Sequence, residues 1–231
     1  MTTVADLVDR FGLPADAGPK LEALLGGLAD PAAPTTVRVR DEAIDVHLSD
    51  SLVALELPTV RRAATIADLG AGAGFPGLAL AAARPDAAVT LIESNRRKAS
   101  FVAELAATAQ LDNVQVAARR AEEAAGKHDV VTARALAELP VVLEYAAPLL
   151  EHGGTVVVWQ GRRHADEERR AEAAAAELGL ARDELRSVRP FRAAQHRHLH
   201  TYVKVAATPD RFPRRPGMAR KRPLGADRDR R

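Results

Sequence analysis

Four glycines stand close together in the stretch IADLGAGAGFPGLAL at positions 66–80. An apolar run ends at Asp68, and Gly70, Gly72 and Gly74 then alternate with other residues. Glycine weakens regular structure, so this density indicates a backbone that needs positive φ or a close approach to another group. Where a strand meets a helix, such a turn directs backbone N–H groups and the helix N-terminus toward a ligand. The stretch therefore predicts a ligand-binding loop.

An acidic residue downstream narrows the choice of ligand. Glu93 ends the next predicted strand, near the spacing of ~20 residues at which a carboxylate receives ribose hydroxyls. The segment GAGFPG also matches the dinucleotide fingerprint G-x-G-x-x-G, but Asp68 would repel a pyrophosphate and could help hold a cationic amino-acid group. These features favour an adenosine-containing ligand other than a nicotinamide dinucleotide. A purely structural glycine turn is the alternative interpretation.

Three further side chains and a histidine series are candidates for chemistry. Arg134 follows the fourth predicted strand, where an arginine could bind a carboxylate or an RNA phosphate, or else form a surface ion pair. His47 and Asp50 lie three residues apart, and on their own they are interpreted as a capping or surface pair. The alternating histidines within residues 196–200 have no nearby cysteine or carboxylate, so we interpret them as a solvated or RNA-facing edge. No metal site is predicted.

The pattern of the chain must position these residues. Residues 3–29 predict one or two short amphipathic helices, and residues 41–57 place apolar side chains at helical spacing. From residue 65, short apolar runs alternate with helical stretches, which is typical of a parallel sheet with helices on both faces. The last two runs, ELRSVRPF and RHLHTYVKVA, are close enough to pair as an antiparallel hairpin at the end of the sheet.

The predicted fold is therefore α/β, a Rossmann-like and mostly parallel seven-stranded sheet with a terminal antiparallel hairpin and a short N-terminal helical extension. Its expected parts are the extension at 1–60, the sheet domain at 61–207 and a basic tail at 208–231. The motif D-x-G-x-G-x-G, the helical preface and the final hairpin together resemble the class I S-adenosylmethionine-dependent methyltransferase fold. The resemblance implies S-adenosyl-L-methionine as the cofactor.

Composition limits the class and location of the protein. Of 231 residues, 47% are hydrophobic, enough for a core, and only 3% are aromatic, so alanine, leucine and valine must fill it. The chain has no cysteine, no apolar run near the ~20 residues that cross a bilayer, and no basic-then-apolar layout at its N-terminus. We therefore expect a cytoplasmic protein without a membrane segment.

The net charge of +2 conceals an asymmetry. Residues 209–231 hold nine Lys and Arg and three Asp, which leaves the rest of the chain slightly acidic. A basic, proline-bearing tail suits a polyanionic partner, and a solubilising tail is the alternative. Its composition predicts a flexible segment, because it offers little apolar surface and its prolines oppose helix formation.

Two catalytic motifs that the chain lacks limit the kinds of atom that could accept the methyl group. Methylation of a pyrimidine carbon commonly uses a cysteine nucleophile, and the chain has no cysteine. Methylation of an exocyclic amine typically uses an Asn/Asp-Pro-Pro-aromatic motif, and only TARALAELP follows the fourth predicted strand. A ring nitrogen with a free lone pair, such as guanine N7, needs neither device because no proton must leave. Catalysis then requires mainly positioning and charge stabilisation.

Longer stretches carry a more specific resemblance. In chain order, HLSDSL, DLGAGAGFPGLALAAARPDAAVTLIESNRRKASFV, RRAEE, TARA, RHL and PRRPGMARKRPL resemble the glucose-inhibited division protein B family of bacterial 16S rRNA guanine-N7 methyltransferases. The resemblance implies methyl transfer to a guanine N7, with 16S rRNA or the small ribosomal subunit as the partner of a monomeric enzyme. Two alternatives on this fold stay open: a methyltransferase acting on a small molecule or protein, and a catalytically silent RNA-binding ribosome-assembly factor.

The matched stretches also imply roles for individual residues. The expected cofactor-binding residues are Asp68, Gly70, Gly72, Gly74, Phe75, Glu93, Ala121, Glu122 and Arg134. The expected catalytic residues are Arg134, His47 and Asp50. The expected RNA contacts are Arg197, Arg214, Arg215, Arg220, Lys221 and Arg222. The chain departs from the family pattern twice: it lacks the W-N-x-x-x-N-L-T stretch before the HLSDSL helix, and Gln160 stands where the family has a lysine.

Overall fold

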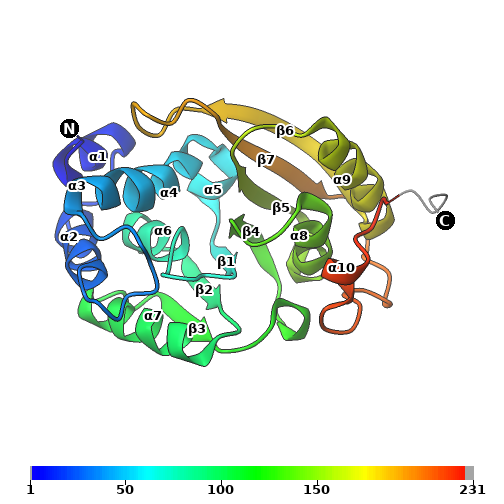
Figure 1. The fold of residues 1–231 in the computed structure, drawn as a ribbon, viewed down its shortest axis with the longest axis horizontal. Coiled ribbons are helices and arrows are strands. Elements are labelled where there is room, and N and C mark those ends of the chain that lie inside the picture. Colours follow the sequence, from blue (N-terminus) through cyan, green and yellow to red (C-terminus); the bar gives the residue numbers. More distant parts are fainter. Residues whose placement is uncertain (1, 227–231) are drawn as a thin grey trace.

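Seven strands form one sheet in residues 2–226, the part of the chain that the computed structural model describes (Figure 1). The strand order is β3-β2-β1-β4-β5-β7-β6. Strands β1 to β5 run parallel, β7 is antiparallel to β5, and β6 is antiparallel to β7. The predicted parallel sheet with a terminal hairpin is confirmed. The strands are β1 (Thr65–Leu69), β2 (Ala88–Ile92), β3 (Val114–Ala117), β4 (His128–Arg134), β5 (Leu150–Gln160), β6 (Leu180–Val188) and β7 (Arg197–Lys204).

Helices cover both faces of the sheet. They are α1 (Val4–Phe11), α2 (Ala17–Leu28), α3 (Arg40–Ala43), α4 (Asp50–Leu52), α5 (Pro58–Arg62), α6 (Gly77–Ala83), α7 (Arg96–Thr108), α8 (Leu139–Ala146), α9 (Ala165–Leu178) and α10 (Met218–Lys221). Ile66 of β1 packs in a core with α1, α2 and α4 to α7, whereas its neighbour Ala67 packs in a second core with α8 to α10. No helix within residues 2–226 is long and apolar enough to span a membrane.

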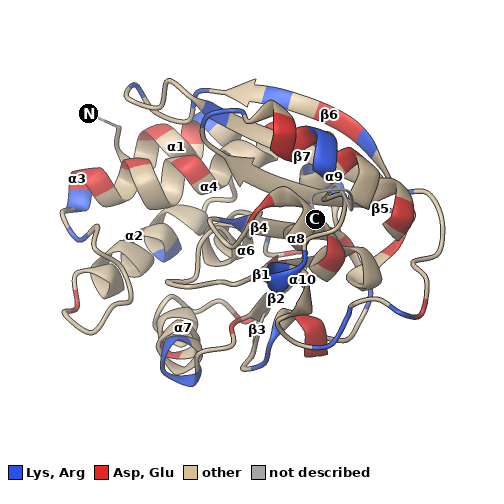
Figure 2. Ribbon diagram, turned by 45° about the vertical axis from the view of Figure 1, so that its right-hand side comes forward, with Lys and Arg blue, Asp and Glu red and all other residues tan. Residues whose placement is uncertain are grey.

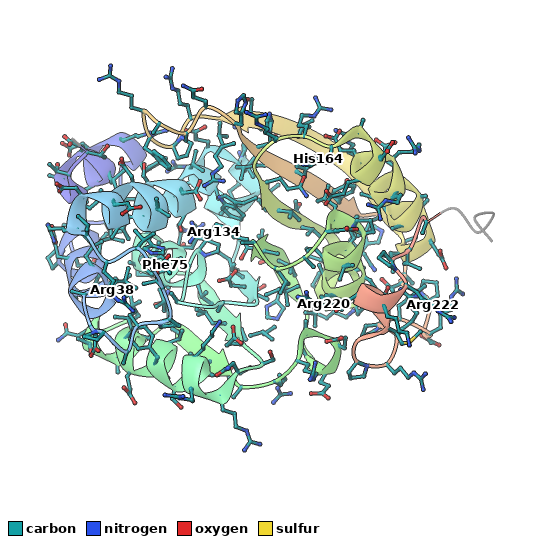
Figure 3. All side chains as sticks on the ribbon, viewed as in Figure 1. Arg38, Phe75, Arg134, His164, Arg220 and Arg222 are labelled. Carbon is teal, nitrogen blue, oxygen red and sulfur yellow. The ribbon has the colours of Figure 1, made fainter. Side chains whose placement is uncertain are left out.

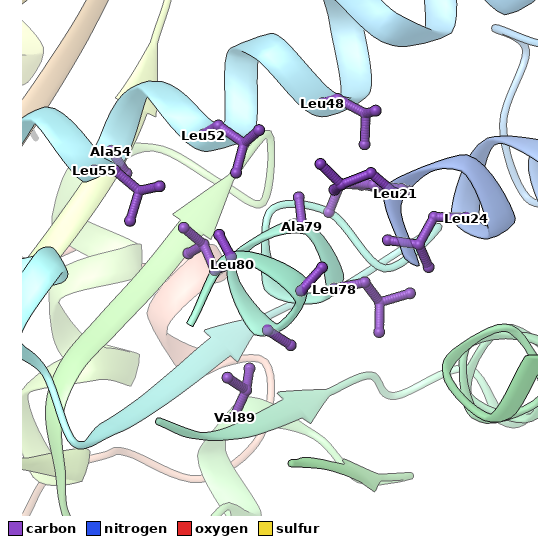
Figure 4. Close-up of a cluster of buried hydrophobic side chains, with 14 of the residues drawn as sticks. Leu21, Leu24, Leu48, Leu52, Ala54, Leu55, Leu78, Ala79, Leu80 and Val89 are labelled. Carbon is purple, nitrogen blue, oxygen red and sulfur yellow. The ribbon is translucent and has the colours of Figure 1, made fainter. Parts of the chain in front are cut away.

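Helix α6 is the centre of the first core. All seven of its residues are buried, which is why its sequence, GLALAAA, has no polar face. Figure 4 shows Leu78 and Leu80 of α6 between Val89 of β2 and the leucines Leu21 and Leu52 of the N-terminal helices. Helix α6, which follows the glycine-rich loop, is thus packed on both sides, so the loop ends at a helix whose position is fixed.

The helical segment before the sheet is irregular at a position that matters for the site. The predicted helix at 41–57 is present, but a π-helical turn, Ile44–Ser49, separates α3 from α4. Such turns widen a helix locally and occur frequently at functional sites. His47 lies within this turn and Asp50 directly follows it, and both side chains are buried.

The C-terminal segment differs from its prediction. Residues 209–226 pack against α8 and include α10, with Phe212 and Ala219 buried in the second core. The fully buried carboxylate of Glu144 on α8 pairs with the Arg214 guanidinium at 2.5 Å. The expectation of a flexible tail is therefore wrong for these residues. The prediction also covered residues 227–231, which lie outside the described part of the chain.

Candidate functional site

The glycine-rich loop connects β1 to α6 at the carboxyl edge of the sheet. Gly70 has φ +68° and Gly72 has φ +59°, as the sequence predicted for a loop of this composition. A Cβ at Gly70 would lie 2.5 Å from Cδ1 of Leu136, whereas a Cβ at Gly72 would meet only the Gly70 carbonyl oxygen at 3.7 Å. The absence of a side chain at Gly70 therefore lets Leu136 of a neighbouring loop pack against it, whereas Gly72 faces open space. Gly74 and Phe75 complete the turn.

Asp68 anchors this loop from beneath. Its fully buried carboxylate accepts hydrogen bonds from Oγ1 of Thr132 at 2.8 Å and from the Gly77 amide at 3.0 Å. Burial raises the pKa of Asp68 to about 6, although both hydrogen bonds oppose that shift. No part of the side chain reaches the surface, so the structure gives no direct support to the expectation that Asp68 contacts a ligand. Asp68 instead joins the start of α6 to β4.

Glu93 is oriented toward the loop by two backbone donors. One carboxylate oxygen accepts from the Gly72 amide at 3.0 Å, and the other accepts from the Asn95 amide at 2.7 Å. Each oxygen keeps a second lone pair, so the carboxylate can still accept hydrogen bonds from a ligand's hydroxyls. The predicted position of an acidic residue beside the glycine loop is thus observed.

A cavity of about 420 Å³, here called the main cavity, opens beside the loop. Ligand sites typically measure about 300–1,000 Å³, so its size suits a small molecule. Its wall brings together the predicted residues His47, Gly70, Gly72, Phe75, Glu93 and Arg134. Figure 3 labels two of these, Phe75 and Arg134, together with Arg220, which lines the same cavity.

A smaller cavity of about 100 Å³, the side cavity, continues from the main one. The two share Gly70, Ser94, Leu136 and Arg220. The side cavity contains Ala121 and Glu122, which follow β3, as expected for the second group of cofactor residues. Only Gly74 and the buried Asp68, among the predicted cofactor residues, line neither cavity.

Arg134, Asp50 and Arg197 form a charged cluster at the end of β4. The buried Asp50 carboxylate accepts from Nη1 of Arg134 and from Nε of Arg197, both at 3.0 Å. The same Arg134 nitrogen donates to the Val46 carbonyl at 2.9 Å, on the π-helical turn. Burial lowers the pKa of Arg134 and the Asp50 carboxylate opposes that shift. Asp50 therefore holds two guanidinium groups in place, one of them beside the main cavity.

His47 lines the main cavity and is uncharged at neutral pH. Its Nε2 lies 3.0 Å from Oγ1 of Thr35, and its ring lies 5.0 Å from the ring of Phe75, centroid to centroid. Burial, followed by the charge of Arg134, lowers the pKa of His47 to about 4. Burial of both side chains rules out the surface pair that the spacing of His47 and Asp50 suggested on its own, and it agrees with the place beside the site that the family resemblance implied.

The predicted RNA contacts divide into four groups. Arg197 belongs to the charged cluster, and Arg220 lines both cavities. Arg214 is engaged with buried Glu144, so its charge is compensated within the protein and the structure does not support it as a free phosphate contact. Exposed cations remain on and beside α10, a basic element in Figure 2; these are Arg215, Lys221 and Arg222.

The histidine series near β7 is not uniformly solvated. His196 is exposed, but His200 is buried, and neither ring nitrogen of His200 has a hydrogen-bond partner. The interpretation as a solvated edge is therefore wrong for His200. Within residues 2–226, no group of three His, Cys, Asp or Glu side chains is placed to hold a metal ion.

A third cavity lies at the ends of β4 and β5 and was not predicted. This β4–β5 cavity has a volume of about 430 Å³ and shares Ala135 and Leu136 with the main cavity. Gln160, which replaces the family lysine, donates from Nε2 to Oε1 of Glu167 at 2.8 Å. Other unpredicted residues in the main cavity are Thr35 and Lys98, whose isolated polar side chains gave no recognisable motif in the sequence.

Comparison with known proteins agrees with this geometry. The sequence profile of the family described as rRNA small subunit methyltransferase G matches residues 32–199. The Ribosomal RNA small subunit methyltransferase G of Chloroflexus aggregans is 39% identical over 199 residues, covering 82% of both chains. The protein of the same name from Thermobifida fusca is 40% identical over 195 residues, covering 76% of this chain and 77% of its own.

The fold has solved counterparts as well. The cofactor-bound crystal structure of Rv0187 from MTB superposes with a TM-score of 0.58 at 22% identity, covering 90% of this chain and 100% of that one. The crystal structure of a putative RNA methyltransferase, PH1948 from Pyrococcus horikoshii, superposes with a TM-score of 0.54 at 17% identity, covering 81% of this chain and 98% of that one. These likenesses and the strand order confirm the predicted class I methyltransferase fold. The family predicted from the glycine loop and its neighbouring stretches is confirmed by the profile and the relatives. The chain belongs to the rRNA small subunit methyltransferase G family.

Proposed function

We propose that the protein transfers a methyl group from S-adenosyl-L-methionine to N7 of a guanine in 16S rRNA. The observation that carries the proposal is the main cavity, where the glycine loop, Glu93 and Arg134 meet at the carboxyl edge of the sheet. In open α/β sheets this edge is where ligands bind. Family membership supports ribosomal RNA as the acceptor, and we propose a monomer that works in the cytoplasm.

The residues present fit this cofactor. Glu93 keeps free lone pairs for ribose hydroxyls, and the open face at Gly72 allows close approach of a ligand to the backbone. The side cavity offers the Ala121 amide region and the Glu122 carboxylate for the adenine. S-adenosyl-L-methionine, when bound, supplies a methyl group on a positively charged sulfur. The protein's part is then to hold the reactants in line and exclude competing acceptors.

The proposed reaction requires no general base. Guanine N7 presents a lone pair as an acceptor in the major groove and carries no proton to remove. His47 is neutral but hydrogen-bonded to Thr35, and Asp50 is neutralised by two arginines. These residues therefore position Phe75 and Arg134 rather than move protons. This is the arrangement that direct attack by a ring nitrogen needs.

We infer that the target base enters through the β4–β5 cavity. It shares Ala135 and Leu136 with the main cavity, so a base within it would lie beside the cofactor. Glu167 lines the cavity, and its Oε1 is fixed by the Leu139 amide and by Gln160, both at 2.8 Å. A fixed carboxylate suits the N–H donors on the Watson–Crick edge of a flipped guanine.

The test uses purified protein, labelled S-adenosyl-L-methionine and small ribosomal subunits from a strain in which the gene is deleted. We expect label in the 16S rRNA as 7-methylguanine at one position, located by strand scission at that base. Naked 16S rRNA, a small-molecule extract and a protein extract serve as competing acceptors. Label in either extract would favour the small-molecule or protein methyltransferase, and subunit binding without transfer would favour a silent assembly factor.

A further inference from the structure

The C-terminal segment 213–222 lies against the cavities although it is outside the family match at residues 32–199. Gly217 lines the side cavity, and Arg220 lines both the side and the main cavity. Arg220, labelled in Figure 3, belongs to α10, which packs against α8. The family profile ends before this segment, and the resemblance of PRRPGMARKRPL to the family assigned its cations to RNA, so neither gives the segment a role at the proposed cofactor site.

Two hydrogen bonds connect this segment to the loops that form the site. Nη2 of Arg220 donates to the Leu136 carbonyl oxygen at 2.8 Å. The Gly217 amide donates to Oε1 of Glu122, also at 2.8 Å. Leu136 follows β4 and Glu122 follows β3, so one short segment ties together two loops on either side of the side cavity.

The contact through Leu136 continues to the glycine loop. The Leu136 side chain packs so closely on Gly70 that a Cβ there would lie 2.5 Å from Cδ1 of Leu136. Arg220 holds the backbone of Leu136, and Leu136 covers Gly70. A displacement of Arg220 would therefore release a residue that shapes the glycine loop itself.

The segment is firmly attached to the body of the protein. Oε1 of Glu144 accepts from the Arg214 amide at 3.0 Å and from Nε of Arg214 at 2.8 Å. Ala219 is completely buried, one residue before Arg220. These anchors fix α10 on α8, so the guanidinium of Arg220 is presented to the cavities by an ordered backbone.

We propose that residues 213–222 form the outer wall of the adenosine part of the cofactor site, with Arg220 as a positioning residue for cofactor binding. The proposal rests on the proposed function, because it takes the main and side cavities as the site of S-adenosyl-L-methionine. It assigns Arg220, expected from sequence to contact RNA, to the cofactor site. It also makes cofactor affinity depend on residues beyond the family's matched core.

The experiment measures S-adenosylhomocysteine binding by calorimetry, without RNA. Arg220→Ala should raise the dissociation constant about tenfold, as loss of a charge-assisted hydrogen bond does. The melting temperature should stay close to that of the wild type, because the Arg220 side chain is exposed. Arg220→Lys should recover part of the affinity, since an ammonium can still donate to the Leu136 carbonyl. In methyl-transfer assays, KM for S-adenosyl-L-methionine should rise while kcat changes little.

Arg211→Ala is the matched control, because it removes a cation from the same segment that pairs on the surface with Glu177. Equal affinities for Arg220→Ala and Arg211→Ala would overturn the proposal and leave α10 to RNA binding or stability. Failure of the proposed function would look different: the wild-type protein itself would not bind S-adenosylhomocysteine.

Discussion

Asp50→Asn tests whether the charged cluster organises the site. The change keeps the size of the side chain but removes the charge that Arg134 and Arg197 share. Asp50 is 1% exposed and the Arg134 side chain 16%, so neither group can turn to water for compensation. Removing one partner of a buried ion pair costs about 3–5 kcal/mol, and since asparagine keeps one acceptor oxygen we expect about 2–3 kcal/mol here. For a chain of this size, that lowers the melting temperature by roughly 4–12 °C.

The assays are thermal unfolding and methyl transfer to small subunits, measured on the same preparations well below the melting temperature. Activity should fall more than tenfold although the protein is folded, because Arg134 loses its anchor beside the main cavity. The matched control is Asp166→Asn, which removes an exposed carboxylate paired with Arg169. Exposed pairs contribute about 0–1 kcal/mol, so this control should be nearly neutral.

Two results would refute the reasoning about Asp50. An Asp50→Asn protein that melts with the wild type would show that the buried cluster contributes no stability. A protein that is destabilised but retains full activity at low temperature would show that Arg134 does not depend on Asp50 for its function. In that case the cluster would be only a part of the scaffold.

Three other changes address the loop, the acid response and the C-terminal segment. Gly72→Val should abolish S-adenosylhomocysteine binding, because φ of +59° is strained for a β-branched residue and its side chain would fill the open face that the ligand approaches. Unchanged affinity in calorimetry would make the loop merely structural. Burial lowers the pKa of His200 to about 4, so its share of stability is lost as pH falls from about 6.5 to 4. His200→Leu should therefore make the free energy of unfolding, measured with urea, less dependent on pH across that range. The same substitution at the exposed His196 should leave that pH dependence unchanged. Arg214→Ala leaves a buried carboxylate unpaired, so it should lower the free energy of unfolding by about 3–5 kcal/mol in the same assay. As the control, Arg215→Ala at an exposed position should lower it by less than about 1 kcal/mol. Equal losses in the two variants would contradict the pairing of Arg214 with Glu144.

The sheet was predictable because its signal is local. Short apolar runs such as TIADL and GTVVVWQ are buried on both faces, and turn residues separate them from helical stretches. Glu93 was also predictable, because its distance from the glycine loop along the chain is set by one helix and one strand. Both features depend on neighbours in sequence, and both were found where they were expected.

The charged cluster could not be predicted, because local sequence patterns do not show which distant residues meet in the fold. Asp50 and Arg197 are 147 residues apart in the chain and meet because β7 inserts beside β5. The burial of Asp68 likewise depends on Thr132 of the neighbouring strand β4. From sequence alone, a carboxylate at a strand end can serve a ligand or a loop, and only the surrounding strands decide which.

The prediction of a flexible C-terminal tail failed for a physical reason, and part of that reason was visible in the sequence. Composition indicates that residues 209–231 offer too little apolar surface to fold alone, but it says nothing of a surface that is already folded. The missed signal was Glu144 within LPVVLEYAAPLL, since a carboxylate in an apolar helix is almost never buried unless it is paired. A buried acid in the body required a cation from elsewhere, and the basic tail supplied Arg214.

This docking changes what the tail's charges can do. The four-residue helix α10 carries Arg220, which contacts the wall of the cavities, and Lys221, which is exposed. A phosphate held by Lys221 and the adjoining exposed Arg222 would act on the same short rigid element that holds Leu136 over Gly70. Under the role proposed above for residues 213–222, any effect of RNA on the position of α10 is an effect on cofactor affinity, and linkage requires that cofactor affects RNA binding by the same factor. On that proposal, the segment that composition predicted to be a separate phosphate-binding arm would couple the two ligands.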